Sequence, residues 1–147
     1  MAGSPSASTL AAASLLGLAT GMRSLLPLAV LSTRYAHPWG LRLLLLPLAA
    51  TELVGDKLPG TGSRLAPGPL GFRIVAGALG AAWLTRSRRR LPLILAGAGG
   101  ALLGALLGFR ARTGLPSITR TPDLPWAVLE DVFAAALAGT AIRLASA

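Results

Sequence analysis

Long uncharged apolar runs, separated by short polar or Gly- and Pro-rich links, dominate the chain. Asp, Glu, Lys and Arg are absent from residues 1–22, 43–51, 74–85 and 91–109. A helix needs about 20 apolar residues to cross a hydrocarbon core of about 30 Å, and several runs approach this length with their flanks. The pattern predicts an all-α integral membrane protein.

The runs and their breakers predict five short transmembrane helices. They are expected at residues 9–32, 41–58, 70–85, 91–109 and 124–144. The first is expected to be one helix with Pro27 inside it, and the links after the second and fourth are expected to be irregular because they contain Gly and Pro. We predict a single transmembrane domain over residues 1–147.

Composition agrees with a membrane setting. Hydrophobic residues make up 53% of the chain and charged residues 13%, whereas a soluble domain has about a quarter charged residues. Lys and Arg outnumber Asp and Glu by 14 to 5, and most lie between apolar runs, as membrane topology and anionic headgroups favour. No aromatic–basic interleaving or known module indicates nucleic-acid binding. The absence of cysteine excludes disulfides, thiolate metal sites and a cysteine nucleophile.

The basic link at residues 86–90 predicts the orientation. Four of its five residues are arginines, so it should be cytoplasmic. Three crossings back along the chain, the N-terminus is then expected outside. The first apolar run lacks a basic region before it, so we do not expect it to be a cleaved export signal.

Two motifs recur in the same order in the two halves. LGLATGMR at 16–23 matches LGALLGFR at 103–110, and LPLAATE at 46–52 matches LPWAVLE at 124–130. Three predicted helices separate the starts of the two units, so the second would be inverted in the membrane. We predict an inverted internal repeat of segments 1–2 and 4–5, with units at about 9–85 and 91–145; chance similarity in a Leu-, Ala- and Gly-rich chain is the alternative.

Arg23 lies inside the first apolar run, where an unpaired charge costs about 2.5–3.5 kcal/mol or more. It therefore requires an acidic partner, and by pseudo-symmetry Arg110 should pair with a second acidic helix. The charged residues predicted to line a substrate or ion pathway are Arg23, Glu52, Asp56, Arg110, Glu130 and Asp131. The alternative is a buried ion-pair network that only fixes helix register.

Small residues recur at four-residue spacing in three of the runs, as Gly17 with Gly21, Gly77 with Ala81, and Gly100 with Gly104 and Gly108. This spacing is typical of closely packed membrane helices. The residues predicted to make such contacts are Gly17, Gly21, Gly77, Gly100, Gly104 and Gly108. The alternative is that bare backbone near Arg23 and Arg110 gives a polar solute access to amides or carbonyls.

No nucleophile–base pair, zinc-ligand spacing or phosphate loop is present, so we predict no enzyme activity, cofactor or metal. A membrane-embedded enzyme would have Glu130 or Asp131 as an acid or base, but the sequence offers no second catalytic group.

Four motifs carry a family resemblance: GMRSLLPL from Gly21, TELVGDKLP from Thr51, RIVAGALGA from Arg73 and LEDVFA from Leu129. Over about residues 15–138 the chain resembles small bacterial multi-pass membrane proteins grouped as a domain of unknown function. The resemblance implies a compact helical fold in the bacterial inner membrane. The resemblance adds Lys57, Pro59 and Arg73 to the residues expected to characterise the family. It implies no activity.

We predict a small transporter or channel for an ion or polar solute, with its pathway at the repeat or subunit interface. A homo-oligomer is expected, a dimer being favoured, because five short helices can barely enclose a pathway. The rival is a non-transporting membrane scaffold or accessory subunit whose ion pairs are structural. The expected partners are the lipid bilayer and the solute, and not nucleic acid.

Overall fold

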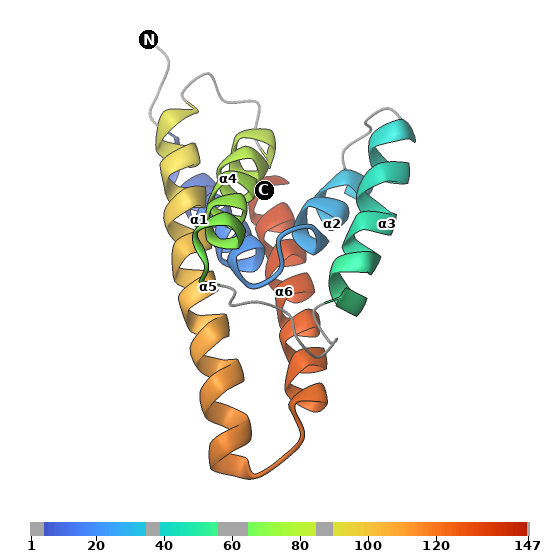
Figure 1. Ribbon diagram of the computed structural model, residues 1–147. Coiled ribbons are helices and arrows are strands. Elements are labelled where there is room, and N and C mark those ends of the chain that lie inside the picture. Colours follow the sequence, from blue (N-terminus) through green and yellow to red (C-terminus); the bar gives the residue numbers. More distant parts are fainter. Residues whose placement is uncertain (1–4, 35–38, 56–64, 85–89, 147) are drawn as a thin grey trace.

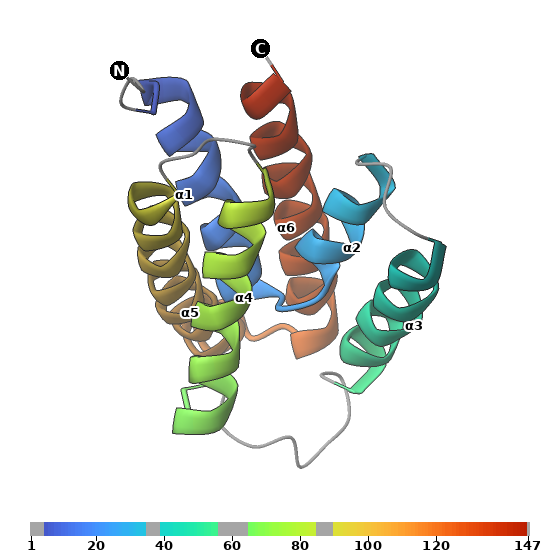
Figure 2. The same cartoon turned by 90° about the horizontal axis from the view of Figure 1, so that it is seen from above.

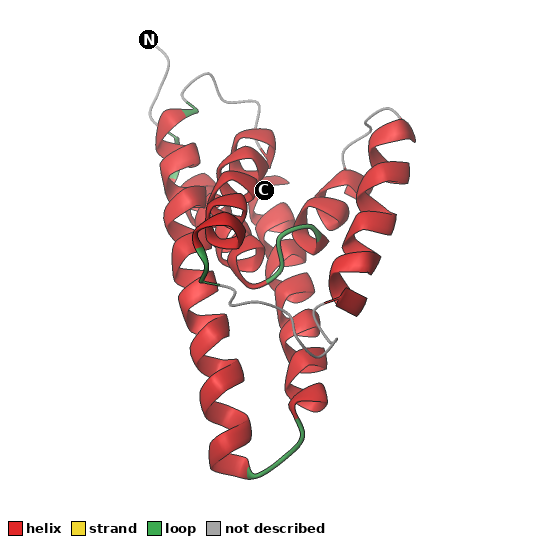
Figure 3. Ribbon diagram, in the orientation of Figure 1, coloured by secondary structure: helices red, strands yellow, loops and turns green. Residues whose placement is uncertain are grey.

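The computed structural model describes residues 5–34, 39–55, 65–84 and 90–146, and all regular structure in these ranges is helical (Figures 1 and 3). The helices are α1 (Ala7–Met22), α2 (Leu26–Arg34), α3 (Trp39–Gly55), α4 (Pro67–Leu84), α5 (Leu91–Thr119) and α6 (Asp123–Ser146). The predicted all-α class is confirmed for the described chain.

The first apolar run forms two helices, so the single helix predicted there is wrong. α1 ends at Met22, and Arg23 has an extended backbone with φ −139° and ψ 111°. Pro27 does not cause the break. It lies in the first turn of α2, where a residue without an N–H is well tolerated.

The chain reverses at this break. Leu31, near the end of α2, lies in the same buried cluster as Ala12 and Leu16 of α1. α2 therefore runs in the direction opposite to α1, and it packs between α6 and α3 (Figure 2).

α5 is longer than predicted. It continues past Phe109 to Thr119, through Pro116, so most of the expected irregular link is helical. The hydroxyls of Thr113 and Ser117 donate to carbonyls of the preceding turn. The helix ends at Arg120, whose φ of 55° is left-handed, as at many helix C-termini.

The glycines place backbones in direct contact. A Cβ at Gly17 would lie 2.1 Å from the carbonyl oxygen of Gly97, and one at Gly21 equally close to that of Ala101. A Cβ at Gly104 would lie 2.1 Å from the oxygen of Leu18. α1 and α5 therefore approach each other as only residues without a side chain allow.

These contacts make α1 and α5 parallel. Gly17 faces Gly97 and Gly100, whereas Gly21 faces Ala101 and Gly104, so the two sequences advance together. An inverted repeat requires the two helices to be antiparallel. The predicted inversion is wrong for this pair, because the break in the first run adds one reversal before α5.

The start of α1, the end of α4 and the start of α5 lie at one end of the molecule. Ala13 of α1, Ala81 of α4 and Leu93 of α5 share one buried cluster. The start of α1 therefore lies at the same end of the molecule as Leu84 and Arg90. The expectation that the N-terminus and the link before α5 lie on opposite sides is wrong for the same reason.

By length and composition, α5 alone among the described helices could cross a membrane, and α1 is a shorter apolar helix. Five membrane spans remain a prediction.

Candidate functional site: the break between α1 and α2

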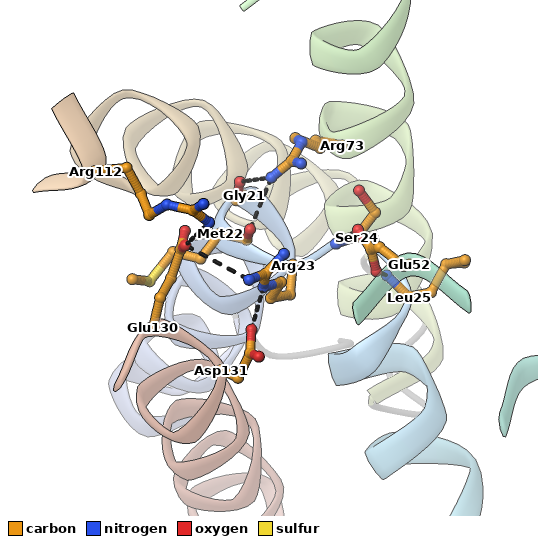
Figure 4. Close-up of polar contacts among 10 residues, drawn as sticks. All are labelled: Gly21, Met22, Arg23, Ser24, Leu25, Glu52, Arg73, Arg112, Glu130 and Asp131. Atoms are coloured by element: carbon orange, nitrogen blue, oxygen red, sulfur yellow. Dashed lines mark hydrogen bonds and ion pairs between the residues drawn. The ribbon is translucent and has the colours of Figure 1, made fainter. Parts of the chain in front are cut away.

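Arg23 lies at the break and is fully buried. Its Nε forms an ion pair with Asp131, and its Nη2 lies 3.7 Å from Oε2 of Glu130 (Figure 4). Both acids are on α6. The prediction that Arg23 has an acidic partner is confirmed, and the partners are the acids of the last helix.

Glu130 has a second arginine partner that the sequence analysis missed. Nη1 of Arg112 on α5 donates to Oε2 of Glu130 at 3.4 Å. Gly108, one turn before Arg112, leaves room for this carboxylate, since a Cβ there would lie 2.8 Å from Oε1 of Glu130. Arg112 continues the four-residue spacing of Gly100, Gly104 and Gly108 and therefore lies near the same face of α5. This spacing could have identified Arg112 from the sequence.

Arg110 does not pair with an acidic helix of the described chain, although the pseudo-symmetry predicted that it would. Its side chain is exposed, and no ion pair joins it to another described residue. Two residues along a helix correspond to about 200° of rotation, so Arg110 and Arg112 leave α5 on opposite faces. The expected symmetry with Arg23 is therefore absent.

Glu52 binds backbone rather than arginine. Its Oε1 accepts from the N–H of Ser24 and its Oε2 from the N–H of Leu25, each at 2.8 Å (Figure 4). These amides lie at the N-terminus of α2, where backbone N–H groups lack partners within the helix. A carboxylate there also interacts favourably with the helix dipole. Glu52 of α3 thus caps α2.

Arg73 caps the other free end. Its Nη1 donates to the carbonyl oxygens of Gly21 at 2.6 Å and Met22 at 2.8 Å. These are the last carbonyls of α1, which have no partner within the helix. Each end at the break is therefore covered by a side chain of opposite charge.

α3 also covers the far end of α2. Nε of Arg42 donates to the carbonyl oxygen of Ser32 at 2.8 Å, and its Nη2 donates to that of Thr33 at 3.3 Å. One helix therefore places a cation at the C-terminus of α2 and a carboxylate, Glu52, at its N-terminus. We name α2 and α3 together the α2–α3 arm.

Apolar contact holds the arm together between its two charged ends. Ala29 of α2 packs with Leu45 and Ala49 of α3, and Trp83 of α4 covers this cluster. The remaining four helices, which we name the bundle, are joined through α1.

The charges near the break are balanced among the described residues. Three arginines (Arg23, Arg73 and Arg112) accompany three acids (Glu52, Glu130 and Asp131). The six residues predicted to line a pathway comprise two arginines and four acids, so the described group differs from them in its balance of charge. Asp56, predicted to line the pathway, and Lys57 and Pro59, which the family resemblance implies as signature residues, lie outside the described residues.

This arrangement can hold and orient charge. In the described part of the chain, no group of three or more His, Cys, Asp and Glu could hold a metal ion. No protein-family model, curated protein or solved structure matches the chain. The resemblance to small bacterial membrane proteins stays a prediction.

Proposed function

We propose that this chain is a multi-pass protein of the bacterial inner membrane that moves an ion or small polar solute. Membrane integration is supported by the large apolar side chains that α3–α6 expose. They include Leu43, Leu44, Val54, Phe72, Val75, Leu79, Leu95, Leu103, Leu107, Val132 and Phe133. Soluble proteins rarely expose apolar surface on this scale, whereas lipid covers it without cost.

The broken helix is the observation that carries the transport proposal. In a bilayer every backbone polar group needs a partner, and an uninterrupted helix would supply all of them. Here the chain instead breaks at Arg23, and Glu52 and Arg73 are required to cover the two helix ends. Many transporters form their solute sites from helix ends exposed at breaks in transmembrane helices. Here the chain reverses at the break, but it likewise brings a helix C-terminus and a helix N-terminus together there.

The packing suggests which part moves. The bundle is held by backbone contacts at Gly17, Gly21 and Gly104, whereas the arm meets it through side chains of α2 and through Trp83. Rotation about Arg23 and Ser24 would carry the arm as one body, because Arg42 and Glu52 tie α3 to both ends of α2. Such a motion would uncover the Arg23 ion pairs to one side of the membrane.

The rival function, a scaffold or accessory subunit, is favoured by a different observation. The described charges at the break are balanced, and each acid is bound by an arginine or by backbone amides. A network of this kind can serve only to fix the helices.

Engineered disulfides separate the two functions, because the chain contains no cysteine of its own. Leu31→Cys with Ala138→Cys would join α2 to α6 within one buried cluster, locking the arm to the bundle. Ala29→Cys with Ala49→Cys would join α2 to α3 and serve as the matched control.

Purified protein would be reconstituted in vesicles and tested for flux of common cations, anions and protons. We expect oxidation to stop flux in the first pair, a reductant to restore it, and the second pair to be insensitive to both. Absence of flux in the unmodified protein for every gradient tested would favour the scaffold.

A further inference from the structure

The two ends of the molecule differ in charge. Three exposed arginines lie at the end where α1 begins: Arg34 at the end of α2, Arg90 just before α5 and Arg143 in the last turn of α6. We name this the arginine end. Leu31, Leu84 and Ile142, which precede these arginines along the chain, share one buried cluster with Ala12 and Leu16 of α1.

No acidic residue of the described helices lies at the arginine end. Glu52 in the last turn of α3, and Glu130 and Asp131 on α6, lie instead at the break between α1 and α2, where Glu130 faces Gly108 of α5. The exposed Arg110 and Arg120 follow Gly108 along α5, away from the arginine end. The positive charge of the arginine end is therefore not offset by any acidic residue of the described helices.

Apolar side chains begin directly beside these arginines. Trp39, the first residue of α3, is 77% exposed, and Leu91, the first residue of α5, is 66% exposed. Tryptophan is enriched where hydrocarbon meets headgroups. The phosphates of nucleic acid could also bind the arginines, but nucleic acid would leave the adjacent apolar side chains exposed to water. A lipid leaflet binds the arginines through its headgroups and covers the apolar side chains with its hydrocarbon.

We propose that the arginine end binds the headgroups of anionic phospholipids and therefore faces the leaflet that is richer in them. α1 begins and α6 ends there, so both termini emerge on that side of the membrane. The proposal rests on the membrane integration proposed above, but not on transport.

Lipid preference is the first test. The full-length protein would be released from membranes of mixed phosphatidylglycerol and phosphatidylcholine, and its bound lipids would be measured by native mass spectrometry. Arg90→Gln with Arg143→Gln removes two charges at the arginine end, and Arg110→Gln with Arg120→Gln removes two at the other end as the matched control.

We expect wild type to retain phosphatidylglycerol preferentially and the first double variant to bind it roughly 30-fold more weakly, as two surface charges predict. The control should keep at least most of the preference. Equal loss in both variants, no preference in wild type, or tighter binding to an oligonucleotide than to the lipid would each overturn the proposal.

Topology is the second test. Ser6→Cys and Ser146→Cys should react with a membrane-impermeant maleimide from one side of oriented vesicles, and Arg120→Cys from the other. Labelling of the first two from opposite sides would contradict the proposal.

A protein that needs neither detergent nor lipid to stay in solution would instead refute membrane integration. Lipid selectivity without flux would refute transport alone.

Discussion

The bundle of α1, α4, α5 and α6 and the α2–α3 arm are held by different forces. In the bundle, glycines bring backbones together so closely that a single added methyl group at Gly21 would overlap a carbonyl oxygen. In the arm, two charged side chains, Arg42 and Glu52, bind the free ends of a short helix. The bundle is therefore sensitive to volume and the arm to charge, and Arg23 stands at the junction of the two.

Loss of Arg23 should have the largest effect. Arg23→Leu leaves Glu130 and Asp131 buried without the cation between them, and removing one partner of a buried ion pair costs about 3–5 kcal/mol. Reversible unfolding in mixed micelles would measure this. Arg110→Leu, at an exposed position, is the control and should leave the free energy of unfolding unchanged. An equal loss in both variants would mean that the ion pairs at the break do not contribute specifically to stability.

The volume sensitivity of the bundle comes next. Gly21→Ala should destabilise by about 1–3 kcal/mol, because α1 and α5 must move apart to accept the methyl group. Gly99→Ala is the control. A Cβ there meets nothing within 4 Å, so the change should be neutral or stabilise the helix by up to about 1 kcal/mol. The same unfolding measurement applies, and similar values for the two variants would remove the distinction between bundle and arm.

The charge sensitivity of the arm should appear locally rather than globally. Arg42→Gln weakens the cap on the C-terminus of α2 and should cost about 1 kcal/mol. Hydrogen exchange should accelerate in α2 and α3 and stay unchanged in α1 and α5. Arg34→Gln, which removes an exposed charge from the same helix end, is the control, and acceleration throughout the bundle would show that the arm does not open as a separate unit.

The smallest effect is expected at Arg112. Its hydrogen bond to Glu130 is long, at 3.4 Å, and Glu130 keeps Arg23 nearby, so Arg112→Gln should cost about 0.5–1 kcal/mol. A double-mutant cycle with Glu130→Gln would isolate the pair. A coupling energy near zero would mean that Arg112 does not stabilise Glu130 and that Arg23 is its stabilising partner.

The sequence predicted those features that depend on local pattern. The apolar runs predicted helices, the Gly spacing predicted close contacts, and burial of Arg23 within an apolar run required an acid. The break could not be seen in this way, because residues 9–32 continue as one apolar run whose visible irregularities, Arg23 and Pro27, do not by themselves end a helix. The break depends instead on Glu52 and Arg73, which are distant in sequence.

The matching motifs around Arg23 and Arg110 were misleading for a related reason. Similar letters occur at the end of α1 and in the middle of α5, but the first chain segment stops there and the second continues as helix. Only Arg23 is turned toward α6. A motif that contains Gly and Arg indicates close packing, but it does not determine whether the helix ends.

The dependence of Arg23 on α6 also constrains biosynthesis. The acids that neutralise it are made more than a hundred residues later, and the caps on either side of it come from α3 and α4. Until α6 has been made, Arg23 lacks the carboxylates that neutralise it. We therefore expect the turn between α1 and α2 to reach its final geometry only after the later helices are in place.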